Sequence, residues 1–187
     1  MERWRNGRRA GFKIQWISVR VRLPLSPPIN HNVMKIIGID PGRHGGMAVY
    51  DAENGNIKVY KMPETFPDIF NLLVQINNEN GGNQNLVAYL EDVGQGIPNQ
   101  SSSATAKFAR HNGHLEMALY AIGIRTEMVK PQKWQKSFSN TLGKSSDYEK
   151  REWKNRLKAL AQRLFPQEKV TLDTADAILI SYYGSKQ

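Results

Sequence analysis

The sequence predicts an α/β domain in which helices flank a mixed five-stranded sheet. Three short apolar stretches follow one another at hairpin spacing between residues 34 and 60, which is typical of an antiparallel meander. Two more stretches, at residues 86–91 and 124–129, each come after a segment with helical periodicity. A strand reached through a helix can lie parallel to the first strand by a right-handed crossover. The sheet is therefore expected to have an antiparallel half and a parallel half.

The first predicted strand lies within residues 34–50, MKIIGIDPGRHGGMAVY, and ends on Asp40. Pro41-Gly42 breaks this strand, residues 47–50 form a second, and residues 56–60 form a third. A carboxylate at the end of a buried strand is costly to desolvate unless it is paired or binds a cation. Asp-Pro-Gly sequences also occur in solvated turns, so this stretch alone leaves Asp40 open between a functional and a structural role.

A second acid closes the next buried strand. Residues 86–91, LVAYLE, form this strand and end on Glu91. If the strand lies parallel to the first, Asp40 and Glu91 meet at the sheet edge where open α/β sheets bind ligands. Strand alternation points the neighbouring Asp92 to the opposite face. A solvated glutamate at the strand end is the alternative interpretation.

Start signals place helices around these strands. Thr65 begins the first helix, and the Asn/Gly-rich segment 77–85 after it is expected to be a loop. Ser101 begins a long helix with apolar residues at helical spacing. The sequence Ser146-x-x-Glu149 is a capping box, which predicts that another helix begins there.

The last predicted helix brings two more acids. The sequence Asp173-Thr174-Ala175-Asp176 opens it, and Gly184 ends it. Because residues at i and i+3 share a helix face, Asp173 and Asp176 are expected to point the same way. One acid near a helix N-terminus is a cap or a dipole partner. Two acids directed at one site indicate a bound cation, since like charges otherwise repel.

Length and composition restrict the class of protein. The chain has 187 residues, enough for one domain with a sizeable core, and it has no cysteine. Disulfides and thiolate metal sites are therefore excluded. No apolar run approaches the roughly 20 residues needed to cross a bilayer. We expect a soluble, cytoplasmic protein with no membrane partner.

The first 33 residues differ in character from the rest of the chain. They hold seven Lys or Arg and one acid, whereas the whole chain has a formal net charge of +9. A basic arm that binds nucleic acid is one interpretation. The run VRVRLPLSPP at residues 19–28 instead resembles a translated tRNA gene, which favours Met34 as the true start. In either case we expect the folded domain to occupy residues 34–187.

Positive charge is also concentrated in residues 130–169, which hold eleven Lys or Arg against four acids. Such a flank attracts phosphates, although most charge runs are simply solvated helix faces. We expect DNA to contact this flank and the long helix before it. The candidate DNA-binding residues are Lys130, Lys133, Lys136 and Lys144 on the flank, and Lys107 and Arg110 on the helix.

These motifs together resemble the RuvC-type Holliday-junction resolvases of the ribonuclease H-like superfamily. The sequence Gly38-Ile39-Asp40-Pro41-Gly42 is similar to the family's opening motif, and Glu91 corresponds to its second acid. The Asp-x-x-Asp of residues 173–176 is similar to the opening of the family's final helix. The resemblance runs from residue 36 to residue 184 in order, spacing and element type. It implies a ribonuclease H-like fold, and the short chain suggests a phage or prophage variant.

The resemblance also implies an activity. Four carboxylates without cysteine or a convincing histidine set form a hard oxygen site, which suits Mg²⁺, with Mn²⁺ able to substitute. Two such ions can support hydrolysis of a phosphodiester bond. By similarity, Asp40, Glu91, Asp173 and Asp176 are both the metal ligands and the catalytic residues. The family acts as a homodimer on four-way DNA junctions. Among its functional lysines, Lys130 or Lys133, and Lys144, are the nearest matches.

Two departures from the family pattern leave the substrate open. The loop after the second acid offers only Ile97 where the family places an aromatic residue, and the turn Arg43-His44-Gly45-Gly46 lacks the usual Ser or Thr. Another ribonuclease H-like metal nuclease, acting on different branched DNA or on RNA–DNA hybrids, is therefore an alternative. A non-catalytic junction-binding protein is a second alternative, but it would not need four aligned acids.

Overall fold

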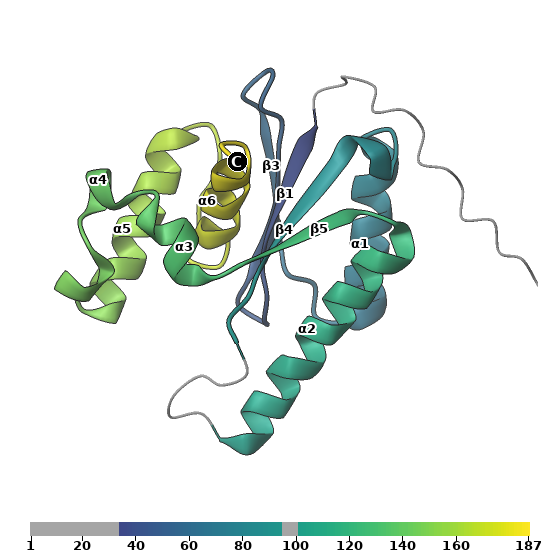
Figure 1. Ribbon diagram of the computed structural model, residues 1–187, viewed down its shortest axis with the longest axis horizontal. Coiled ribbons are helices and arrows are strands. Elements are labelled where there is room, and N and C mark those ends of the chain that lie inside the picture. Colours follow the sequence, from purple (N-terminus) through teal and green to yellow (C-terminus); the bar gives the residue numbers. More distant parts are fainter. Residues whose placement is uncertain (1–33, 95–100) are drawn as a thin grey trace, which may run out of the picture. The chain divides into compact units, whose positions relative to one another are not determined.

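The computed structural model describes residues 34–94 and 101–187. The basic arm expected at residues 1–33, and Ile97 in the loop after the second acid, lie outside the described residues. In the described part, a five-stranded sheet separates two groups of helices (Figure 1). No helix in that part is both long and apolar enough to cross a bilayer.

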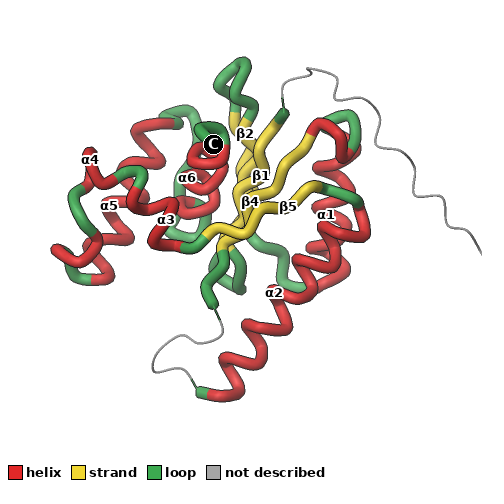
Figure 2. Tube along the Cα trace, viewed as in Figure 1, coloured by secondary structure: helices red, strands yellow, loops and turns green. Residues whose placement is uncertain are grey.

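The sheet is mixed, as predicted. Its strands are β1 (Lys35–Asp40), β2 (Gly46–Tyr50), β3 (Ile57–Lys61), β4 (Leu86–Glu91) and β5 (Arg125–Val129), in the spatial order β3-β2-β1-β4-β5. The pairs β1–β2 and β2–β3 are antiparallel, whereas β1–β4 and β4–β5 are parallel. Figure 2 shows the strands in yellow between the helices in red. The parallel half exists because the connections into β4 and β5 each contain a helix.

Helices cover both faces of the sheet. One face packs against α1 (Phe66–Glu79) and α2 (Ser102–Ile122), through a core that includes Ile37, Ile39 and Leu90 (Figure 1). The other face packs against a second group of helices, through a core that includes Trp134, Leu157 and Ile178. This second group comprises α3 (Pro131–Lys136), α4 (Ser139–Leu142), α5 (Lys150–Leu164) and α6 (Ala175–Gly184).

Strand alternation decides which residues face α6. Along β1, Ile37 and Ile39 belong to the core under α1 and α2, so Gly38 and Asp40 point to the other face. Gly38 has the role of a spacer, because a Cβ built on it would lie 2.1 Å from the carbonyl oxygen of Ala177. Only a residue without a side chain allows α6 to lie this close to β1.

Two helix starts are confirmed and one is wrong. Thr65 accepts a hydrogen bond from the backbone N–H of Asp68 at 3.3 Å, and Ser101 caps α2 in the same way. The capping box of residues 146–149 does not form, because the Ser146 hydroxyl donates to Asp147 instead. Helix α5 begins at Lys150, after a 3₁₀ turn at residues 145–147.

The connections contain more helix than the sequence suggested. The expected loop at residues 77–85 holds the last turn of α1 and a 3₁₀ turn at Asn83–Asn85. The short helices α3 and α4 were not anticipated. Pro131 occupies the first position of α3, where proline is well tolerated.

Candidate active site

Three carboxylates gather on the α6 face of the sheet. Asp40 is the last residue of β1 and Glu91 the last of β4, and the register pairs Ile39 with Leu90 immediately before them. Asp40 and Glu91 are therefore neighbours at the carboxyl ends of parallel strands, as the sequence indicated. Asp176 lies in the first turn of α6, which packs on this face. Glu91 and Asp176 are buried, and Asp40 is partly buried.

Asp173 lies outside this buried group. Because Thr174 is the N-cap and α6 begins at Ala175, Asp173 precedes the helix, and the expectation that both aspartates share a helix face is wrong. The Asp173 side chain is 36% exposed, and one of its oxygens lies 3.9 Å from the ammonium of Lys61 on β3. Its charge still contributes to raising the pKa of Asp40, so it stands at the rim of the cluster.

Burial raises the pKa of all three acids, and the charges of neighbouring acids raise the pKa of Asp40 and Glu91 further. Burial raises the pKa of Asp40 well above its usual range, and the charges of Asp176 and Glu91 raise it further. Burial also raises the pKa of Glu91 to about 7, against the opposing effect of a hydrogen bond from Trp134. The pKa of Asp176 is raised by burial as well, although Lys154 opposes this shift. Such a cluster favours the arrival of a cation.

Two residues that the sequence did not single out hold these acids in place. The indole N–H of Trp134, which is fully buried on α3, donates to a carboxylate oxygen of Glu91 at 2.7 Å. The ammonium of Lys154, on α5, donates to Asp176 at 3.3 Å. In the sequence, Lys154 was one member of a basic run and Trp134 one aromatic within it. Only the packing of α3 and α5 on the sheet gives them these roles.

The donor chemistry of the site suits a hard divalent cation. Asp40, Glu91 and Asp176 offer only carboxylate oxygens, which are the ligands that Mg²⁺ and Mn²⁺ prefer. As the side chains lie, however, no three His, Asp or Glu residues among 34–94 and 101–187 are arranged so that they could hold a metal together. Asp176 is engaged by Lys154. The residue types therefore suit a metal, whereas the side chains as they lie do not form a metal site. Binding would require the Asp176 carboxylate to exchange Lys154 for the cation.

Replacing Trp134 with phenylalanine is expected to move the pH dependence of the site. The indole N–H bonds to the charged form of Glu91, so losing it favours the protonated form and raises the pKa above about 7. A cation site that needs an ionised Glu91 would then require a higher pH. We expect the acid limb of metal binding or cleavage to move upward by roughly half a unit to one unit. A titration with Mn²⁺ across pH 5.5–9 measures this, and an unmoved limb in a folded variant contradicts it.

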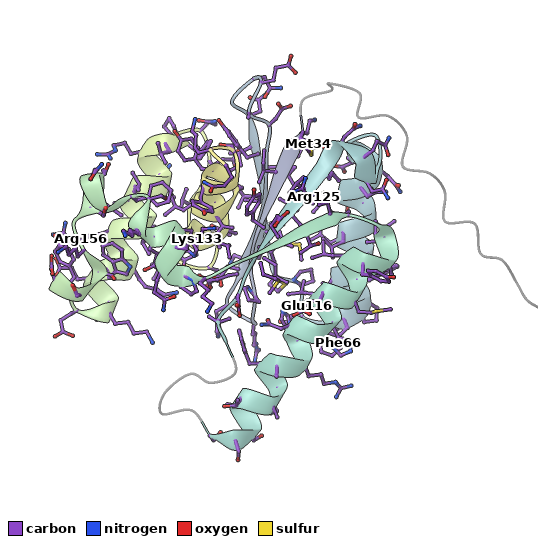
Figure 3. All side chains as sticks on the ribbon, viewed as in Figure 1. Met34, Phe66, Glu116, Arg125, Lys133 and Arg156 are labelled. Carbon is purple, nitrogen blue, oxygen red and sulfur yellow. The ribbon has the colours of Figure 1, made fainter. Side chains whose placement is uncertain are left out.

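The candidate DNA-binding residues are all exposed, and the lysines among them line different cavities. Lys136 and Lys144 line a cavity of about 270 Å³ between α3, α4 and α5, with Trp153 as one wall. Lys133 instead lines a cavity of about 530 Å³ beside β5, together with Met34 and Arg125 (Figure 3). Lys130 is the N-cap of α3.

The other two candidates lie on α2, and no residue of this helix lines either of the two cavities. Lys107 is exposed on this helix, and the guanidinium of Arg110 lies 5.7 Å from the ring centre of Phe66. Phe66, labelled in Figure 3, packs beside α2. Its ring stacks on that of His114, with ring centres 3.7 Å apart. His114 thus has a packing role on the Phe66 ring.

Comparisons with known proteins support the fold and leave the family unassigned by sequence. No protein-family model matches the chain, and no curated protein matches it. Among solved structures, RuvC of Thermus thermophilus in complex with a Holliday junction substrate matches with a TM-score of 0.55 at 14% identity, covering 80% of this chain and 92% of that one. Another structure of Thermus thermophilus RuvC matches with a TM-score of 0.52 at 15% identity and the same coverage. This chain therefore has the ribonuclease H-like fold of RuvC, with a mixed five-stranded sheet and helices on both faces.

Proposed function

We propose that this protein is a metal-dependent endonuclease that resolves four-way or otherwise branched DNA junctions by phosphodiester hydrolysis. The observation that carries the proposal is the convergence of Asp40, Glu91 and Asp176, from β1, β4 and α6, at one edge of a RuvC-like sheet. Open α/β sheets bind ligands at the carboxyl ends of their strands. A Thermus RuvC with this fold is described in complex with a Holliday junction substrate, which favours branched DNA as the ligand.

The proposed cofactor is Mg²⁺, with Mn²⁺ able to substitute. Asp40, Glu91 and Asp176 would hold the cation, and Asp173 at the rim is the proposed fourth ligand. Two ions bound there would activate a water and stabilise the leaving oxygen of the phosphodiester. The protein's own part is to orient the carboxylates. Trp134 positions Glu91, and the packing of α6 against Gly38 positions Asp176.

The basic flank is proposed to bind the phosphate backbone. Replacing both Lys136 and Lys144 with alanine is expected to weaken binding to every DNA shape. The slope of log K against the logarithm of the salt concentration should become less negative by about 0.9 for each lost phosphate contact. Fluorescence anisotropy with labelled junction and duplex at several salt concentrations measures this. Lys58→Ala is the control, because Lys58 lies on β3 and pairs with Glu79. An unchanged salt slope in the double variant would leave these lysines as solvated surface.

A homodimer is part of the same proposal. Met117 and Tyr120 stand three residues apart on α2 and are 62% and 80% exposed. Residues at this spacing share a helix face, so two large apolar side chains lie together in solvent. A second copy packing on this face would bury both of them. The mass of the protein in solution, measured by light scattering, tests the dimer.

The activity itself is tested with a panel of substrates. Labelled four-way junction, flap, duplex and RNA–DNA hybrid are incubated with the protein and Mg²⁺, and the products are mapped on a sequencing gel. We expect cleavage of the junction in preference to duplex, and none with EDTA. Preferred cleavage of the flap or hybrid would assign the protein to a different nuclease class. Tight junction binding without any cleavage would indicate a non-catalytic junction-binding protein.

A further inference from the structure

Lys154 lies partly in solvent and contacts the acid cluster formed by Asp40, Glu91 and Asp176. Its side chain is 46% exposed, whereas the side chain of Asp176, to which its ammonium donates at 3.3 Å, is 10% exposed. The lysine side chain therefore extends from the surface of α5 to a carboxylate in the first turn of α6. Its positive charge also acts on Asp40 and Glu91, lowering the pKa of each. The charge of this one ammonium thus stabilises the ionised forms of three acids, which lie on β1, β4 and α6.

A second cation at Asp176 would conflict with this arrangement. An ammonium and a divalent ion repel each other strongly at a few ångströms in a partly buried site. The Asp176 oxygen that accepts from Lys154 can therefore bind either the ammonium or a metal ion, whereas binding both at once is unfavourable. A lysine has a four-carbon stem with several rotatable bonds, so its ammonium can move without any change in the helix. Phosphate oxygens are equally good acceptors for it.

We infer that Lys154 is a built-in counter-cation of Asp176 that a divalent metal displaces, and that the released ammonium then binds a phosphate oxygen of the DNA. The inference rests on the proposed function and deepens it, because it names the residue that couples metal entry to substrate positioning. In the metal-free protein, Lys154 limits the repulsion among the acids. In the loaded protein, it is a positioning residue for the phosphate.

The test separates two effects of opposite sign in Lys154→Met, which keeps the apolar stem and removes the charge. Binding of Mn²⁺ alone, measured by calorimetry, should become about tenfold tighter, because the competing cation is gone. Junction cleavage at saturating Mn²⁺ should fall by about tenfold or more, because the phosphate contact is lost. Lys158→Met removes a charge one turn along the same helix and should leave Mn²⁺ affinity unchanged. Lys154→Arg should restore part of the cleavage.

Three results would overturn the inference. These are Mn²⁺ binding that is unchanged or weaker in Lys154→Met, cleavage that is unchanged in that variant, and a wild-type protein that binds no Mn²⁺. Lys154→Gln is measured in parallel as a second neutral variant, and circular dichroism establishes that both are folded. If the wild-type protein binds Mn²⁺ but cuts no junction, the proposed function fails, and the Mn²⁺ titration alone then decides whether Lys154 competes with the metal.

Discussion

Asp176→Asn is expected to lower junction cleavage by at least about a hundredfold while the protein stays folded. The substitution removes a proposed ligand of the cation without changing the size of the side chain. In the metal-free protein, the buried carboxylate has a raised pKa because burial disfavours its charged form. At pH 7.5, well above the pKa of an unfolded aspartate, the folded state bears this cost. The neutral asparagine removes the cost, so melting without metal should be unchanged or slightly later.

Glu91→Gln is expected to follow the same pattern, because the amide oxygen can still accept from Trp134. Asp92→Asn is the matched control. Its carboxylate caps the backbone N–H of Gly94 at 3.1 Å, and strand alternation places it on the other face of the sheet. The Asp92→Asn variant should cleave the junction at the wild-type rate. If Asp176→Asn melted earlier and yet cleaved normally, Asp176 would be a structural residue and the metal assignment would be lost.

Gly38→Ala is expected to destabilise the protein by about 3 kcal/mol or more, which is the upper end for an overpacked core. The new methyl group would lie 2.1 Å from the carbonyl oxygen of Ala177 and 2.4 Å from the backbone nitrogen of Ser181. Backbone atoms of α6 cannot rotate away, so the helix must shift as a unit. Because Asp176 lies on α6, the acid cluster would be disrupted as well, and Mn²⁺ binding should weaken.

A glycine-to-alanine substitution at Gly113 is expected to have the opposite effect on the free energy of unfolding. Gly113 is in the middle of α2, and a Cβ built on it meets nothing within 4 Å. Gly113→Ala should therefore stabilise the protein by roughly 0.5–1 kcal/mol through helix propensity. Urea denaturation of the two variants and the wild-type protein measures both effects. Equal midpoints for Gly38→Ala and the wild-type protein would contradict a close packing of α6 on β1 at Gly38.

The sequence by itself determined the sheet and the two strand-end acids. Apolar stretches of strand length, the turn at Pro41-Gly42 and the intervening helices were enough to predict a mixed sheet. They were also enough to place Asp40 and Glu91 on neighbouring parallel strands. These features depend on local periodicity and on connection length, which can be read from consecutive residues.

Local signals were weaker at the helix starts near the site. A capping box competes with other hydrogen bonds of its short polar side chains, and in residues 146–149 the Ser146–Asp147 bond formed instead. The start of α6 at Ala175 rather than Asp173 is a shift of two residues, and it moved Asp173 from the helix face to the rim. Small errors in helix boundaries therefore change which acids share a site.

Only the tertiary structure decided which residues donate hydrogen bonds to the buried acids. Trp134 and Lys154 lie 43 and 22 residues away from their partners Glu91 and Asp176. No periodicity links residues so far apart, and their contacts exist because α3, α5 and α6 pack on one face of the sheet. The division of the lysines between two cavities has the same origin. Sequence patterns determine which elements form, whereas the environment of a buried charge depends on every element that packs around it.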